Sequence, residues 1–228
     1  MSIAIIEAQI AQLTKTLNTL KFAQRKQSAS PILCLFDLET TGLGKTAHIK
    51  ICEYGMVNYT TGRVFQRHVN PLQAVSESVT RIHGLRSDFL ARQSSWKRVG
   101  VELNDAIEEA RDGDNSKPVI LGGFNSKRYD SRILTFEHHR HGLRYPPNVF
   151  FVDFREILTD FVPLQKKKGL AEYHKAATGK EIVSAHTAVA DARAIANILD
   201  TIADRDALFE KIEGSMEATE ACIRRCFK

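Results

Sequence analysis

The sequence of 228 residues lacks any apolar run long enough to cross a membrane. A membrane-spanning helix needs about 20 consecutive, mainly apolar residues. The N-terminus also lacks the basic start and apolar block that are typical of a secretory signal peptide. We therefore expect a protein that has no contact with membranes, is not secreted and is intracellular, in the cytoplasm or the nucleus.

Cysteine is scarce, and its four copies lack the spacing of a secreted disulfide framework. Cys34 and Cys52 lie in apolar, strand-like runs, where a thiol usually acts as a small hydrophobic group. Cys222 and Cys226 lie four residues apart in an expected helix, but no histidine is near them to complete a metal site. These observations favour a reducing compartment and structural roles for the thiols.

The composition shows neither a shortage of hydrophobic residues nor a large excess of one charge. Hydrophobic residues make up 43% and charged residues 26% of the chain, which excludes a disordered or low-complexity protein. The length suits one compact domain. The net charge of +5 favours an anionic partner such as nucleic acid, although a charge of this size also serves solubility.

Residues 1–30 form a segment of their own, in which an amphipathic helix over residues 1–22 precedes a polar linker. Two interpretations of the helix are open: it packs on its own domain, or it binds a second copy of the chain, a polymerase or a helicase. We place the main domain at residues 31–202 and a closing helix that packs on it at residues 203–228. The apolar positions of the first helix are Ile3, Ile6, Ile10, Leu13, Leu17 and Leu20.

The pattern of residues 31–202 predicts an α/β fold with a mixed five-stranded sheet flanked by helices. Three β-like runs separated by short turns come first and predict an antiparallel meander. Two further apolar runs alternate with helical patterns, which predicts parallel additions to the sheet. The expected strands are 31–40, 49–60, 63–70, 119–124 and 149–154, and the expected helices are 76–83, 95–111, 128–139, 154–161, 170–178, 189–199 and 204–226.

Two acidic residues stand at the end of the first expected strand. Asp37 and Glu39 are two positions apart, so both carboxylates leave the same face of the sheet. This geometry suits metal ligands, but solvated strand ends also commonly carry Asp and Glu. The pair by itself leaves both interpretations open.

Two later segments carry further candidates. Asp130 follows a buried strand where a helix begins, a place where ligand-binding groups collect in α/β sheets. His186 precedes a helix whose first turn contains Asp191, and alanines along this helix allow a close approach to the sheet. Taken singly, Asp130 also fits a helix cap, Asp191 a charge that favours the helix dipole, and His186 an ordinary loop histidine.

Together these segments resemble the DEDDh family of 3′–5′ exonucleases in the ribonuclease H-like superfamily, which includes ribonuclease T and exonuclease I. Asp37 and Glu39 match the first motif, Asp130 the second, and His186 and Asp191 the third. Residues 51–55 and 81–85 are also similar to the family, and the resemblance covers about residues 31–199. It implies a ribonuclease H-like sheet and these five residues as the catalytic set.

The resemblance also implies the cofactor and the chemistry. Four converging carboxylates would repel one another by roughly 3 kcal/mol per pair at 5 Å and an effective dielectric of about 20. Two Mg²⁺ or Mn²⁺ ions, held by Asp37, Glu39, Asp130 and Asp191, would neutralise this charge and stabilise the attacking and leaving oxygens. His186 would act as the general base, because histidine titrates near neutral pH.

Further residues are implied at the substrate. Thr40, Thr41 and Leu43 would hold the terminal nucleotide, with Asn125 near the same pocket. His83 fits either a contact with substrate or a structural hydrogen bond. Candidates for backbone phosphates are Arg81, Arg86, Lys127, Arg128 and the run Lys166-Lys167-Lys168, and we assign His138, His139, Arg140 and His141 to the surface.

The resulting hypothesis is a metal-dependent exonuclease that removes nucleoside 5′-monophosphates from a nucleic acid with a free 3′ end. Single-stranded or frayed DNA is favoured by the family resemblance alone. The alternatives are a 3′–5′ exoribonuclease and a non-catalytic nucleic-acid-binding module on the same fold, and the latter would tolerate loss of a metal ligand. None of the ligands is lost here.

Overall fold

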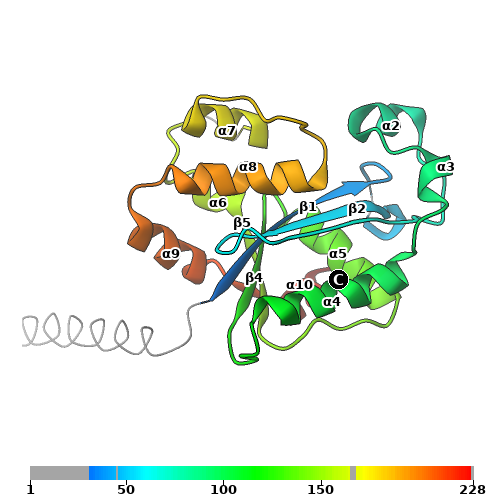
Figure 1. The fold of residues 1–228 in the computed structure, drawn as a ribbon, viewed down its shortest axis with the longest axis horizontal. Helices are drawn as coiled ribbons and strands as arrows, with labels where there is room; N and C mark the ends of the chain where they lie inside the picture. Colours follow the sequence, from blue (N-terminus) through cyan, green and yellow to red (C-terminus); the bar gives the residue numbers. More distant parts are fainter. Residues whose placement is uncertain (1–30, 45, 165–167, 227–228) are drawn as a thin grey trace, which may run out of the picture.

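A mixed β-sheet lies between two layers of helices in the computed structural model, which describes residues 31–44, 46–164 and 168–226 (Figure 1). The sheet order is β3-β2-β1-β4-β5-β6. The pairs β1–β2, β2–β3 and β5–β6 are antiparallel, whereas β1–β4 and β4–β5 are parallel. The strands are β1 (Ile32–Thr40), β2 (Ile51–Asn58), β3 (Val64–His68), β4 (Val119–Gly123), β5 (Val149–Asp153) and β6 (Glu217–Ala218).

The helices divide between the two faces of the sheet. Those from α6 to α9 pack on one face, and α4, α5 and α10 pack on the other, while α2 and α3 form a lobe beside the tip of β1 (Figure 1). The helices are η1 (Thr46–His48), α2 (Glu77–His83), α3 (Ser87–Leu90), α4 (Trp96–Ala110), α5 (Asp130–Arg140), α6 (Phe154–Leu158), α7 (Leu170–Thr178), α8 (Ala188–Asp200), α9 (Arg205–Gly214) and α10 (Thr219–Cys226).

The side-chain alternation of β1 separates the two cores. Leu33 and Leu35 join the apolar cluster under α6–α9, whereas Cys34 and Phe36 join the cluster under α4, α5 and α10. Because side chains on a strand alternate between faces, Asp37 lies on the α8 face of the sheet. The first strand therefore provides the floor of two cores and directs its acidic end toward α8.

The expected α/β fold is confirmed, with the meander, the parallel additions and the flanking helices in place. The sheet has one strand more than the predicted five, because β6 pairs with β5 through Phe150–Ala218 and Phe151–Glu217. The single closing helix over 204–226 is therefore wrong. Gly214, a poor helix former, ends α9, and β6 then covers the backbone edge of β5 before α10 begins.

Two other sequence expectations concern the chain ends and membranes. The N-terminal helix and linker of residues 1–30 lie outside the described residues, so their packing or partner stays a prediction. Within the described ranges, every helix is too short or too polar to span a membrane.

The short helices η1 and α3 were not anticipated, because neither is long enough to show a hydrophobic period.

Candidate functional site

The sheet brings four residues of β1 and β2 together on the α8 face. Asp37 lies opposite Gly55, and Glu39 lies opposite Glu53 in the antiparallel register. Gly55 lets the first turn of α8 lie directly on β2, since a Cβ atom there would lie 2.5 Å from the backbone C of Ala188 and N of Val189. This close approach carries Asp191, in the same turn of α8, to the two acids of β1.

The outcome is a carboxylate cluster. Asp37, Glu39 and Asp191 each offer a ligand oxygen, and these atoms lie within 4.8 Å of one another. Hard divalent cations such as Mg²⁺ and Mn²⁺ prefer oxygen ligands of this kind. The donor set therefore fits a divalent metal and could hold one.

Electrostatic strain in the cluster supports the same fit. Burial raises the pKa of Asp37 well above its usual range, and the charges of Asp130, Asp191, Glu39 and Glu53 raise it further. Burial, followed by the charges of Asp191, Glu53 and Asp130, raises the pKa of Glu39 to about 8. A cation would relieve this repulsion, because it stabilises the ionised form of each carboxylate.

Asp130 stands just outside this trio. It is the first residue of α5 and is 7% exposed. Burial raises the pKa of Asp130 to about 7, with a further contribution from the charge of Asp153. Its own charge raises the pKa of Asp37 and Glu39, which places it within electrostatic reach of the trio.

His186 lies at the open side of the cluster. Its side chain is exposed, and its backbone N–H donates a hydrogen bond to Oδ2 of Asp191 over 3.2 Å. Ser184 and His186 have φ angles of 58° and 67°, a left-handed conformation that is uncommon for residues other than glycine. These turns lead the chain past the carboxylates and leave the imidazole accessible from outside.

Glu53 is the residue of this site that sequence reasoning missed, although its segment was part of the resemblance. Its carboxylate is 2% exposed and accepts hydrogen bonds from the N–H of Ala188 at 3.1 Å and from Nε2 of Gln66 at 2.5 Å. Nε2 of His68 lies 3.5 Å from the same carboxylate. Both oxygens are therefore occupied by donors of the protein, and Glu53 holds the start of α8 in place.

Thr40 and His83 form part of one hydrogen-bonded group beside the cluster. The Thr40 hydroxyl donates to the carbonyl of Gly42 at 3.1 Å and lies 3.2 Å from the Tyr129 hydroxyl, which also bonds to Gly42. Nδ1 of His83 accepts from the N–H of Leu85 at 3.0 Å, so Nε2 carries the proton and donates to the carbonyl of Thr40 at 3.3 Å. Burial lowers the pKa of His83. These contacts support the structural alternative for His83.

The three other expected substrate residues differ in their surroundings. Thr41 Oγ1 accepts from the N–H of Lys50 at 3.1 Å and from Nε2 of Gln73 at 2.8 Å. Asn125 has a φ of 58°, and its Oδ1 accepts from Nη1 of Arg155 at 3.1 Å. Leu43 is 90% exposed and faces solvent. Leu43 therefore has the side chain most available for an external molecule.

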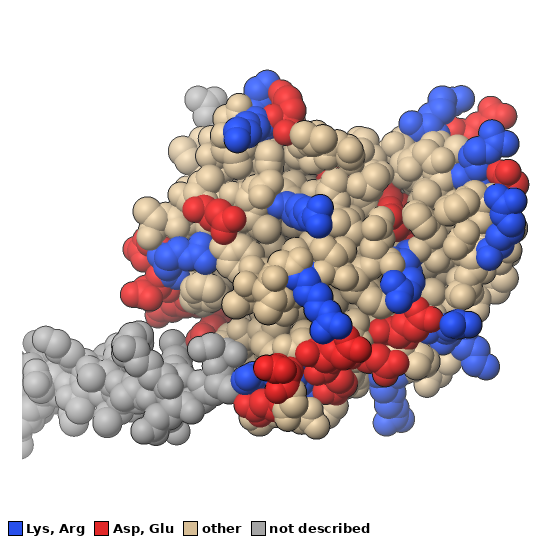
Figure 2. Space-filling view, viewed as in Figure 1, with Lys and Arg blue, Asp and Glu red and all other residues tan. Residues whose placement is uncertain are grey.

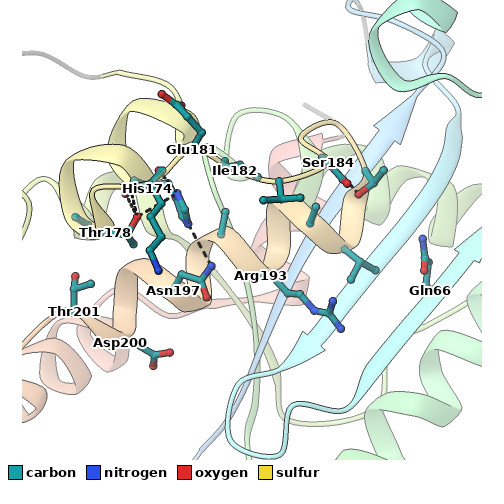
Figure 3. Close-up of a pocket in the computed structure, with 17 residues that line it drawn as sticks. Gln66, His174, Thr178, Glu181, Ile182, Ser184, Arg193, Asn197, Asp200 and Thr201 are labelled. Carbon is teal, nitrogen blue, oxygen red and sulfur yellow. Dashed lines mark hydrogen bonds between the residues drawn. The ribbon is translucent and has the colours of Figure 1, made fainter.

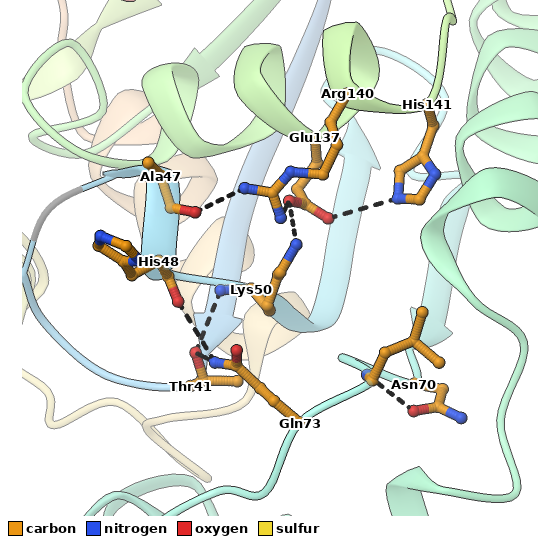
Figure 4. A network of polar contacts seen from close by, with 10 residues as sticks. Thr41, Ala47, His48, Lys50, Asn70, Gln73, Glu137, Arg140 and His141 are labelled. Carbon is orange, nitrogen blue, oxygen red and sulfur yellow. Dashed lines mark hydrogen bonds and ion pairs between the residues drawn. The ribbon is translucent and has the colours of Figure 1, made fainter.

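A second polar network fixes the loop that contains Thr41 (Figure 4). Its centre is Glu137 of α5, which is 3% exposed and lies 2.7 Å from Nη1 of Arg140 and 3.3 Å from Nζ of Lys50. Nη2 of Arg140 also donates to the carbonyl of Ala47 at 2.6 Å. The network ties the loop between β1 and β2 to α5, the helix that begins with Asp130.

The sequence predicts that the histidine-rich segment at the end of α5 lies on the surface. In the structure, only part of this segment does. His138 is 1% exposed, and its ring stacks on Tyr145 with centroids 4.1 Å apart. Helical periodicity turns this position toward α4 and the core, whereas His139 is exposed. The assignment to the surface was therefore wrong for His138.

The candidate phosphate contacts are exposed, but several already have acidic neighbours. Arg86 lies 3.1 Å from Asp88, and Lys127 lies 3.5 Å from Glu156. Arg81 is 4.0 Å from Glu77, and Arg128 is exposed. Lys166 and Lys167 lie outside the described residues, whereas Lys168 is described and exposed.

An exonuclease family model, RNase_T, matches residues 34–199, which include the acidic cluster and nearly all of β1 and α8. The chain belongs to this exonuclease family. A comparison with curated protein sequences finds no match.

Two solved structures share the fold of this chain. One is a 3′-exonuclease described as recognising the 3′ end of a histone mRNA stem-loop; it has 18% identity and a TM-score of 0.62 over 94% of this chain and 82% of that chain. The other is exonuclease I, with 15% identity and a TM-score of 0.62 over 79% of this chain and 42% of that chain. The chain thus spans less than half the length of exonuclease I.

Proposed function

We propose that the protein hydrolyses nucleic acid from a free 3′ end and releases nucleoside 5′-monophosphates. The observation that carries this proposal is the trio of carboxylates within 4.8 Å of one another beside the exposed His186, in a chain of an exonuclease family. A non-catalytic binding module would not require this set of acids. The proposed substrate is single-stranded or frayed DNA, with RNA as the alternative.

In the proposed mechanism, Asp37, Glu39, Asp130 and Asp191 would hold two Mg²⁺ or Mn²⁺ ions. Bound ions would neutralise the charge that builds up on the phosphate and orient the scissile bond. His186 takes a proton from the attacking water, whose oxygen forms the new bond to phosphorus. The bond from phosphorus to the 3′ oxygen of the preceding nucleotide breaks, and this oxygen takes a proton from solvent and becomes the 3′ hydroxyl of the shortened strand. The released nucleotide therefore keeps its phosphate on the 5′ side.

The other proposed contacts lie around the terminal nucleotide. Leu43 offers an exposed apolar surface to its base, and Thr40, Thr41, Asn125 and His83 shape the pocket. The solved 3′-exonuclease is described as recognising histone mRNA, which favours RNA as a second substrate class to be tested here.

The test uses oligonucleotides labelled at the 5′ end: single-stranded DNA, duplex DNA and RNA. We expect a ladder of shortened products that requires Mg²⁺ or Mn²⁺ and disappears in EDTA. Asp37→Ala should reduce the rate by a factor of about 10³ or more, since one metal ligand is lost. Asp206→Ala, at an exposed position of α9, is the matched control and should retain the wild-type rate. Equal rates for both variants would contradict the proposal.

A further inference from the structure

An open groove of about 940 Å³ runs along the outer side of α8 (Figure 3). Residues spaced three or four apart line it from one end of the helix to the other, so they share one helix face. From Thr187 to Thr201 this face is about 20 Å long at 1.5 Å per residue. The residues of this face are Thr187, Ala190, Arg193, Asn197 and Thr201.

The groove begins at the candidate active site. Ser184 and Thr187, which line it, lie on either side of His186 in the sequence. Gln66 of β3, whose amide donates to Glu53, lines the groove as well. One end of the groove therefore lies beside the loop that contains His186.

The charges of the groove favour an anion. Within the described residues, the guanidinium of Arg193 and the ammonium of Lys180 have neither a hydrogen bond nor an ion pair. Of the two acids that line the groove, Glu181 forms an ion pair with Lys175 over 2.5 Å, and Asp200 accepts a hydrogen bond from the Tyr59 hydroxyl at 2.6 Å. Nη2 of Arg205 donates to the same hydroxyl at 2.9 Å, so a further cation lies close to Asp200. Arg193 and Lys180 thus stay available to an anion.

The surface around the groove agrees with this charge pattern. Figure 3 shows Arg193 extending from α8 across the groove toward the strand that carries Gln66. Figure 2 shows the largest group of Asp and Glu side chains on this face of the molecule over α4, and further ones near α9 and the end of α8. Apolar groups add a second kind of contact, because Ala190 and Ala194 lie on the floor and Val183, at the rim, is 85% exposed.

We propose that this groove binds the nucleic-acid strand upstream of its 3′ end, with Arg193 and Lys180 at backbone phosphates. The inference rests on the proposed function, since it deepens the description of the substrate. Phosphate contacts supply most of the affinity of a protein for a nucleic-acid strand, and exposed apolar groups can meet the faces of the bases. A length of about 20 Å corresponds to about six stacked nucleotides at 3.4 Å per step.

The first test measures binding without hydrolysis. A fluorescent 12-nucleotide single strand is titrated in EDTA, at several salt concentrations, with Arg193→Ala/Lys180→Ala. The matched control is Arg224→Ala/Lys117→Ala, which removes the same charge from the exposed side of α10 and from the turn before β4. We expect the groove variant to bind about 10-fold more weakly, and the slope of log K against log salt to fall by about 1.4 for two lost contacts.

If both double variants weakened strand binding equally, the effect would be one of net charge, and the inference would be overturned. If neither variant weakened binding, the inference would be overturned as well. The single variant Arg193→Lys keeps the charge and should keep the salt slope. A smaller salt slope for Arg193→Lys than for the wild type would show that the substitution disturbs α8 itself. This result would also contradict the proposed role of the groove.

The second test uses hydrolysis with Mg²⁺ and separates the groove from the proposed function. The ratio of kcat/KM for the 12-nucleotide strand to that for a dinucleotide should fall about 10-fold in Arg193→Ala/Lys180→Ala. An unchanged ratio would overturn the inference. If the wild type hydrolyses neither substrate, the proposed function fails, whereas the binding measurement in EDTA still decides whether the groove holds the strand.

Discussion

The carboxylate of Glu53 accepts a hydrogen bond from the backbone N–H of Ala188, with 3.1 Å between Oε2 and N. The bond joins β2 to the first residue of α8, three positions before Asp191. The bond also holds the Glu53 carboxylate in a buried position next to the acidic trio. Burial is the main cause that raises the pKa of Asp37, Glu39 and Asp191, and the charge of Glu53 raises all three further. Glu53 therefore positions one metal-ligand candidate and adds to the attraction of the site for cations.

The first prediction follows from the charge of Glu53. Glu53→Gln keeps the size of the side chain but removes one negative charge, so Mg²⁺ affinity should fall about 10-fold, a change of about 1.4 kcal/mol. Isothermal titration with Mg²⁺ measures it, and the Mg²⁺ dependence of activity should shift equally. Glu210→Gln, at an exposed position of α9, is the control. Equal Mg²⁺ affinities for the two variants would show that Glu53 has no effect on metal binding.

The second prediction concerns the contact between β2 and α8. A methyl group in Gly55→Ala would meet the backbone of Ala188 and Val189 at 2.5 Å, and no flexible side chain can yield there. We expect about 1–3 kcal/mol lower stability and at least a 10-fold loss of activity, because Asp191 moves with α8. Chemical denaturation and the exonuclease assay measure the two effects.

Gly214→Ala is the matched control for this change. A Cβ atom at Gly214 meets nothing within 4 Å, and the residue has no left-handed conformation. Its stability should equal or slightly exceed that of the wild type, since alanine favours a helix more than glycine does. If Gly55→Ala behaved in the same way, the close approach of α8 would not matter for activity.

The third prediction is a pH-dependent stability of the metal-free protein. In the folded state the pKa of Glu39 rises from 4.5 to about 8, and that of Asp130 from 3.8 to about 7. Between the ordinary and the raised values, the folded state binds more protons than the unfolded state, so stability decreases as the pH rises. The midpoint temperature of thermal unfolding in EDTA should therefore decrease as the pH rises from about 5 to about 8.

Metal should reverse this loss. Because the ionised carboxylates bind the cation, Mg²⁺ should raise the unfolding temperature more at pH 8 than at pH 6. Scanning fluorimetry at both pH values, with Mg²⁺ and with EDTA, measures the difference. The same increase at both pH values would mean that the titrating carboxylates do not hold the ion.

The fourth prediction tests His186 as the general base. A positioned general base contributes a factor of about 10² to 10⁴ to the rate, so His186→Ala should lower the rate at pH 7.5 by about that factor. The control is His139→Ala, at an exposed position of α5. A full rate for His186→Ala would require another base.

The sequence by itself determined the local elements and the chemistry that they carry. Residues 32–40 form a strand, and Asp37 and Glu39 are two positions apart in it. Their side chains therefore point to the same face, because successive side chains of a strand alternate. The turn residues and the change from strand to helix periods predicted the mixed sheet, and these local signals depend only on neighbouring residues. The motif spacing was sufficient to indicate the family, which the family model confirmed.

Only the tertiary structure decided how distant segments meet. Glu53 and Ala188 are far apart in the sequence, and nothing in either segment alone indicates their hydrogen bond. The strand β6 interrupted an expected helix because the edge of β5 offered backbone partners. The charge of the groove along α8 likewise depends on the tertiary structure. Folding decides which side chains form ion pairs, as Lys175 and Glu181 do, and which cations stay available.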